Sequence, residues 1–119
     1  MERVRGLCER VAANKDLVMR FAVVEGEDRG PYANLMFESS DLQRLWGSLS
    51  DVLYGDEKVG PALSKASIAM CEGREGWNDY LLLYHFDSSV ELDTFQGTYL
   101  VQNSQRRYRS WFRIIRESS

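Results

Sequence analysis

The chain has few of the residues from which metal and catalytic sites are usually built. Its 119 residues include one histidine, two cysteines and two prolines. The cysteines, Cys8 and Cys71, have no histidine or third cysteine close by in the sequence, and this spacing does not support a zinc site. Both stand in apolar patterns, so we expect buried free thiols. The sequence thus predicts no metal, no cofactor and a reducing, cytoplasmic compartment.

Long hydrophobic runs are missing as well. The N-terminal residues MERVRGLCER carry charges where a secretory signal would be apolar, and no apolar stretch approaches the roughly 18 residues of a membrane span. Residues 55–61 contain two glycines and a lysine but depart from the phosphate-loop pattern, and nucleophile-elbow and calcium-loop motifs are absent. We expect no membrane partner. The missing motifs argue against catalysis without excluding it.

Basic charge is scarce over most of the chain. The formal net charge is −3; residues 1–105 carry 10 basic and 17 acidic groups, net −7, and residues 106–119 carry 5 basic and 1 acidic, net +4. Nucleic-acid binding through a general basic surface is therefore not expected. The composition, 44% hydrophobic and 28% charged, is that of a globular protein, and we expect one domain over residues 1–119.

Hydrophobic periodicity predicts an α+β fold of order α-β-β-α-β-β-β-α, an antiparallel sheet of about five strands with amphipathic helices packed on it. Helices are expected over residues 2–13, 40–55 and 103–116, and strands over 17–24, 32–38, 67–71, 77–86 and 95–102. Ser40 and Gln43 fit a capping box, and Gly55 suits a left-handed helix end. Residues 56–65 are expected to form a loop, with at most one helical turn.

The hairpin over residues 67–86 has the most apolar pattern in the chain. Four large side chains recur at the two-residue period of a strand on its second arm, namely Tyr80, Leu82, Tyr84 and Phe86. Leu81 and Leu83 make the opposite side apolar too, and strands that are apolar on both faces are normally central and covered. We therefore predict that this hairpin lies at the centre of the sheet, beneath the helices.

Two periods compete in the last element. As a helix, it places Tyr108, Trp111, Phe112 and Ile115 on one face and Arg106, Arg109, Arg113 and Arg116 opposite. As a strand, its aromatic and β-branched residues have suitable propensity. We favour the helix because both stripes follow its period, and the strand remains the alternative.

The preferred functional hypothesis is a non-catalytic cytosolic protein that binds another protein. A concrete form is a bacterial inhibitor or toxin-neutralising immunity protein, which suits the small size and acidic body. The candidate partner-binding residues are Arg74, Glu75 and Trp77 at the hairpin turn, Tyr32, and the arginines Arg106, Arg109, Arg113 and Arg116. A homo-oligomer is compatible with the same features.

Two alternatives come from other classes. A small enzyme or ligand-binding domain would have its pocket near His85, Asp79 and Asp87, since an imidazole beside carboxylates can transfer protons. A nucleic-acid binder would use the C-terminal arginines together with the stacking faces of nearby aromatics, although the acidic body makes this the less favoured alternative.

Overall fold

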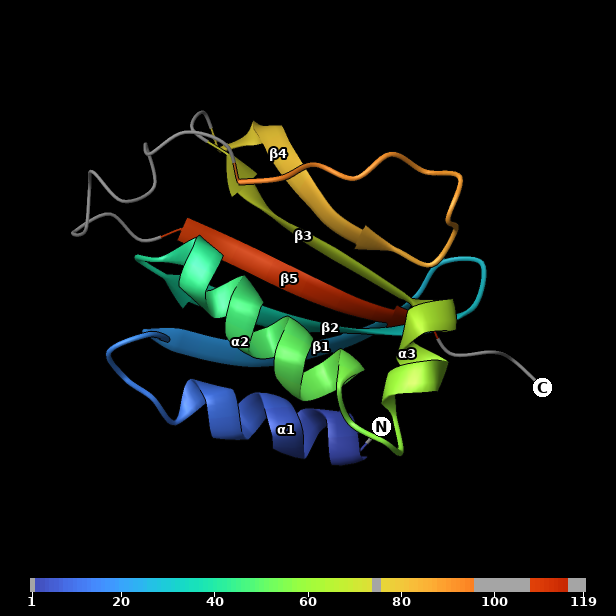
Figure 1. Cartoon of the computed structure of the whole chain (residues 1–119), viewed down its shortest axis with the longest axis horizontal. Helices are drawn as coiled ribbons and strands as arrows, with labels where there is room; N and C mark the ends of the chain where they lie inside the picture. Colours follow the sequence, from blue (N-terminus) through green and yellow to red (C-terminus); the bar gives the residue numbers. More distant parts are fainter. Residues whose placement is uncertain (1, 74–75, 96–107, 116–119) are drawn as a thin grey trace.

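The computed structural model describes residues 2–73, 76–95 and 108–115, which form one α+β domain. A five-stranded antiparallel sheet carries helices on one face (Figure 1), as the sequence predicts. The elements are α1 (Glu2–Ala12), β1 (Arg20–Glu27), β2 (Pro31–Ser39), α2 (Leu42–Tyr54), α3 (Gly60–Ala66), β3 (Ser67–Gly73), β4 (Gly76–His85) and β5 (Tyr108–Ile115). Among the described helices, none is long and apolar enough to cross a membrane.

The sheet order is β1-β2-β5-β3-β4, so the last strand lies between the two hairpins. The favoured helix over residues 103–116 is therefore wrong for residues 108–115, which form a strand paired with β2 on one side and β3 on the other. Its buried positions alternate, Tyr108, Ser110, Phe112 and Ile114, with a period of two. Most of the strand expected over residues 95–102 lies outside the described residues.

The helix α2 supplies much of the core above the sheet. Leu42, Leu45, Leu49 and Leu53 recur every three or four residues and are at most 1% exposed. The side chain of Asp41 caps the helix by accepting from the backbone N–H of Arg44, one residue later than the capping box predicts.

The end of α2 also differs from expectation. Gly55 has a right-handed φ of −80° instead of a left-handed one. A side chain is excluded there because a Cβ would collide with the carbonyl oxygen of Asp51. The loop expected over residues 56–65 is wrong for residues 60–65, which form all but the last residue of the seven-residue helix α3, where Pro61 suits the first helical turn.

Tyr54 joins the helices to the sheet. Its ring centroid lies 4.6 Å from that of Tyr84 and 6.0 Å from that of Phe112. Its hydroxyl hydrogen-bonds to the Oγ of Ser67 at 2.7 Å, and that Oγ in turn donates to the carbonyl oxygen of Leu63. Burial raises the pKa of Tyr54 well above its ordinary value of 10.0, so the phenol stays protonated in the core.

The hairpin of β3 and β4 is not central, because β4 is an edge strand. Ala69 pairs with Tyr84 and Met70 pairs with Leu82, so Leu83 is an extra residue on β4, a β-bulge. The bulge shifts the alternation of the strand. Leu83 is buried and Tyr84 packs against the core, whereas Tyr80 and Phe86, predicted to lie beneath the helices, are 48% and 41% exposed.

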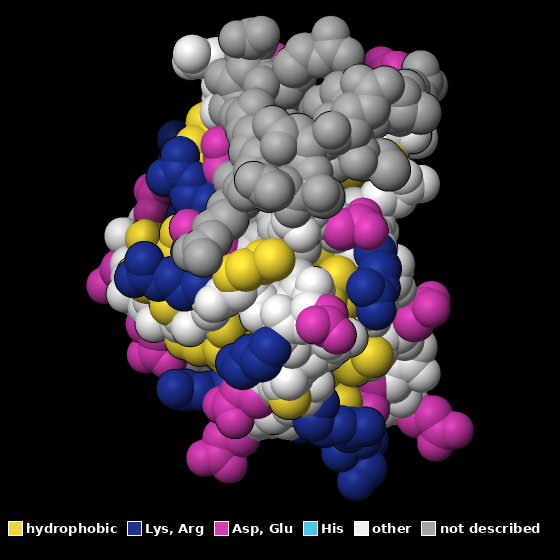
Figure 2. Space-filling model, turned by 90° about the vertical axis from the view of Figure 1, so that its left-hand side faces the viewer, with side chains coloured by type: hydrophobic (Ala, Val, Ile, Leu, Met, Phe, Trp, Pro, Cys, Tyr) yellow, Lys and Arg dark blue, Asp and Glu magenta, His cyan; other side chains and the backbone are white. Residues whose placement is uncertain are grey.

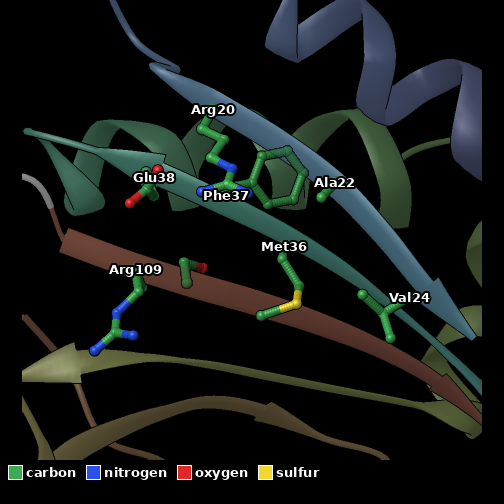
Figure 3. A pocket seen from close by; sticks show the side chains of 8 residues that line it. Arg20, Ala22, Val24, Met36, Phe37, Glu38 and Arg109 are labelled. Carbon is green, nitrogen blue, oxygen red and sulfur yellow. The ribbon is translucent and has the colours of Figure 1, made fainter. Parts of the chain in front are cut away.

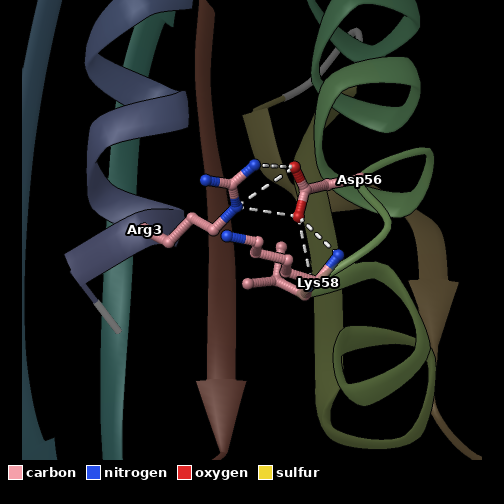
Figure 4. A network of polar contacts seen from close by, with 4 residues as sticks. Arg3, Asp56 and Lys58 are labelled. Carbon is pink, nitrogen blue, oxygen red and sulfur yellow. Dashed lines mark hydrogen bonds and ion pairs between the residues drawn. The ribbon is translucent and has the colours of Figure 1, made fainter.

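An ion pair ties α1 to the segment between α2 and α3 (Figure 4). The Nη2 of Arg3 lies 2.7 Å from the Oδ1 of Asp56, and the Nε donates to both carboxylate oxygens. The Oδ2 of Asp56 also accepts from the backbone N–H groups of Lys58 and Val59, at 3.0 and 2.9 Å. These four donors hold the pKa of Asp56 well below its ordinary value of 3.8, with the Arg3 hydrogen bond as the largest cause.

We predict that Asp56→Asn lowers the free energy of unfolding at pH 7. Because the folded-state pKa is depressed, the ionised carboxylate stabilises the fold above pH 3.8, and this stabilisation is lost as the pH falls towards the folded-state value. Urea unfolding at pH 7, 5 and 3 should show a variant deficit that shrinks at pH 3. The control is Asp51→Asn, which removes an exposed carboxylate of α2; an equal, pH-independent loss in both variants would contradict this role.

We further predict that Phe112→Ala costs about 3–5 kcal/mol of unfolding free energy, the usual range for removing a large buried aromatic side chain. Phe112 is 1% exposed at the centre of β5. Its neighbour Trp111 points to the other face and is partly exposed, so Trp111→Ala should cost clearly less. Urea denaturation of both variants measures the difference. Equal losses would show that β5 does not alternate as described.

Candidate functional site

The face of the sheet opposite the helices, here called the open face, has no described helix over it (Figure 1). It is made of the outward side chains of all five strands, which are partly or largely exposed except for Glu72. Directly opposed residues of antiparallel neighbours lie on the same face, so the pairing register arranges these side chains in rows that cross the strands.

One row is apolar across all five strands. Ala22 pairs with Met36, Met36 with Trp111, Trp111 with Met70, and Met70 with Leu82. All five side chains are partly exposed. Sheets with one solvated face usually alternate apolar and polar positions, so an apolar row across the outer face departs from that pattern.

A charged row lies beside it. Arg20 pairs with Glu38, and Glu38 pairs with Arg109. The Oε1 of Glu72 accepts from the backbone N–H and the Nε of Arg109, at 2.7 and 2.8 Å. Glu72 is 6% exposed and raises the pKa of Arg109. The Arg109 guanidinium lies 5.9 Å from the ring centroid of Trp77, so this ion pair joins β3, β4 and β5.

Arg113 stands on the other side of the apolar row, between Asn34 and Ile68. Its Nε donates to the Oδ1 of Asn34 at 2.7 Å. Its guanidinium carbon lies 3.9 Å from the ring centroid of Tyr32 and 5.1 Å from that of Trp111. Stacking on two rings fixes the cation on the open face without neutralising it.

A groove of about 290 Å³ runs along the open face between β1, β2 and β5 (Figure 3). Met36, Ala22 and Val24 form its apolar part, and Arg20, Glu38 and Arg109 lie at one end. Val24 is 48% exposed, the most of any large hydrophobic residue of β1. The groove therefore offers an apolar floor with charged groups at its end.

The structure places the predicted partner-binding residues as follows. Tyr32, Arg109 and Arg113 lie on the open face, and Trp77 lies beside Arg109. Arg74, Glu75, Arg106 and Arg116 lie outside the described residues. Sequence reasoning missed Met36, Met70 and Trp111 as surface groups. A period of two over residues 108–115 would have placed Trp111 between the two arginines.

The predicted catalytic group is not assembled. Asp79 and His85 are six residues apart on one strand, about 20 Å at the usual rise per residue. His85 pairs with Ile68 and its Nδ1 accepts from the backbone N–H of Asp87 at 3.0 Å. Asp87 accepts from the N–H and hydroxyl of Ser89, which lower its pKa. His85 and Asp87 thus form a turn at the end of β4, away from Asp79.

The cysteines are buried free thiols, as predicted. Burial raises the pKa of Cys8 and of Cys71 to about 12, so both remain protonated at neutral pH and supply no nucleophilic thiolate. Among the described residues, no group of three or more His, Cys, Asp or Glu side chains is placed to hold a metal ion.

Comparison with protein-family models, with curated proteins and with solved structures found no match for the chain.

We predict that Glu72→Ala costs about 1–3 kcal/mol of unfolding free energy, because the backbone N–H of Arg109 loses its acceptor within the sheet. Glu72→Gln keeps an acceptor oxygen and should recover part of this loss. Urea denaturation of the two variants and the parent chain measures the effect. A Glu72→Ala variant as stable as the parent would show that water satisfies this N–H equally well.

Proposed function

We infer that the chain is a non-catalytic protein-binding domain that uses its open face. The supporting observation is the apolar row from Ala22 to Leu82, which crosses all five strands on the face without described helices. Burying such a row against a partner releases the water over it, and aromatic anchors such as Trp111 dominate the energy of many interfaces.

The dimensions of the row favour a helix as the partner element. Five strands spaced about 4.8 Å apart span about 19 Å, the length of a helix of about 13 residues. The helical pitch of about 5.4 Å is close to the strand spacing, so successive turns can place apolar side chains over successive strands. A helix packing across the open face would complete the layer that the sheet has on its other side.

The charges of the open face favour an acidic flank on that helix. Arg20, Arg109 and Arg113 lie on the open face with Glu38 and Glu72, a net charge of 3 − 2 = +1, whereas the whole chain carries net −3. The Arg113 guanidinium stacks on Tyr32 beside the apolar row, where a carboxylate on the flank of an apolar helix face could reach it. We therefore propose an acidic amphipathic helix of another protein as the occupant.

An inhibitor or immunity protein is a concrete form of this function, with a toxin or effector as the partner. It requires no catalytic group on this chain. Binding at the open face also explains why the predicted anchors Tyr32, Arg109 and Arg113 are not used for the core.

We predict that Arg113→Glu abolishes capture of the natural partner and that Arg10→Glu does not. The two variants make the same change of charge, one on the open face and one on the exposed side of α1. The partner is captured from native cells with the parent chain and identified by mass spectrometry, and its affinity for purified variants is measured by calorimetry. Trp111→Ala should weaken binding about 30-fold, as expected for a hot-spot aromatic.

A partner that binds all three variants with the affinity of the parent chain would place the interface elsewhere. Thermal unfolding of each variant shows whether a loss of binding comes with a loss of fold.

A further inference from the structure

The outer edge of β1 is the second surface that the fold leaves open. Within the described chain, β1 pairs with β2 alone, over eight consecutive residues. The opposite edge of the sheet is different, because Asp93 donates its backbone N–H to the carbonyl oxygen of Leu82 and accepts the N–H of Leu82 on its carboxylate. A long edge strand without such cover is a template for pairing with another strand.

The charges along β1 are arranged so that the strand is complementary to itself. Residues 15–20, which lead into the strand, carry exposed Lys15, Asp16 and Arg20, a net charge of 2 − 1 = +1. Residues 25–29 at its other end carry exposed Glu25, Glu27, Asp28 and Arg29, a net charge of 1 − 3 = −2. Two copies related by a two-fold axis perpendicular to the sheet pair antiparallel, so the basic end of each lies beside the acidic end of the other. We propose that the occupant of this edge is a second copy of the chain, giving a dimer with one continuous ten-stranded sheet.

We place the two-fold axis at Val24, because this register sets apolar residues of β1 opposite each other and Arg20 beside an acidic residue. Val24 then faces its own copy, Ala22 faces Gly26, and Arg20 lies beside Asp28 of the second copy. Val24 is 48% exposed in the single chain and becomes covered along one side. Side chains directly opposite in such a pair have Cβ atoms about 5 Å apart, within reach of a Val-to-Val contact.

The surface beside the first end of β1 has room for the acidic end of the second copy. A hollow of about 330 Å³ lies between α1 and β1, and its lining has two basic groups and one acidic group: Glu9, Ala12, Ala13, Lys15, Met19, Arg20 and Phe21. In this register Glu27 of the second copy lies opposite Phe21, on the side of the sheet that carries Lys15 and the hollow. Figure 2 views the end of the molecule at which β1 begins, and its lower half shows Lys and Arg side chains interspersed with Asp and Glu side chains and exposed hydrophobic atoms.

The helix layer is compatible with this pairing. α1 contacts both β1 and β2, so the α1 helices of two copies would run antiparallel on either side of the two-fold axis. Gly6 of α1 has no atom within 4 Å of the position of a Cβ, and Ala13, the residue directly after the end of α1, is exposed. These small residues allow the two helices to approach closely.

Sedimentation equilibrium on the purified chain alone tests the proposal. We expect a monomer–dimer equilibrium in the parent chain, weakened by 1 M NaCl. Reversing the basic end (Lys15→Glu with Arg20→Glu) or the acidic end (Glu27→Lys with Asp28→Lys) should each raise the dimer dissociation constant about tenfold or more, because like charges then oppose each other in two symmetric places. Val24→Lys, at the two-fold axis, should have a similar effect.

The variant with both ends reversed is the matched control. It keeps the net charge of −3 and restores opposite charges across the axis, so its dissociation constant should return to within about threefold of the parent value. A parent chain that stays monomeric up to 0.5 mM, about the concentration at which weak dimers are populated, overturns the proposal. So does a dimer that the single-end reversals leave unchanged in variants that circular dichroism shows to be folded. No partner protein is present in these measurements. Arg20 and Val24 also line the groove of the open face, so the reversal of Glu27 and Asp28, which do not line it, is the variant that separates edge pairing from binding at the open face.

Discussion

The pairing of β5 with both β2 and β3 is the interaction on which the rest of the structure depends. Without it, β1 with β2 and β3 with β4 would be separate two-stranded hairpins, and isolated hairpins are marginally stable in water. The same eight residues serve both faces. The core contains the side chains of Tyr108 and Phe112. The open face contains those of Arg109, Trp111 and Arg113. The core and the proposed binding surface therefore form or fail together.

Most of the fold could be predicted from local patterns, because each of those elements obeys one period. The stripe of α2 and the alternation of β2 give their positions to within a few residues. The strand β5 could not be predicted in this way, since its aromatic and arginine residues fit a helical period as well as a strand period. The deciding factor is not local: β2 and β3 each present an unpaired edge, and a strand satisfies both edges where a helix satisfies neither.

The predicted histidine site is not assembled because Asp79 and His85 are six residues apart along β4, and the β-bulge at Leu83 separates them further by face. A strict period of two places His85 and Asp79 on one face, but an inserted residue reverses the alternation beyond it. Nothing in the run of leucines and tyrosines shows where the insertion falls. The position of the insertion follows from the cross-strand pairs, because Ala69 pairs with Tyr84 and Met70 pairs with Leu82, which leaves Leu83 unpaired in the register. Side-chain direction on β4 is thus set by β3, so the sequence of β4 alone is insufficient.

The sequence indicates which residue types could bind a partner, but it does not indicate how these residues are arranged on the surface. Tyr32, Trp77, Arg109 and Arg113 were selected for their chemistry, but a helical period sets the arginines opposite the aromatics. The strand brings Arg113 onto Tyr32 and Trp111, and Arg109 towards Trp77. This difference has a chemical consequence. Arginines on a separate face would form a solvated cationic stripe, whereas arginines stacked among aromatic rings are held in place next to an apolar row, which suits recognition of a partner that is apolar and acidic at once.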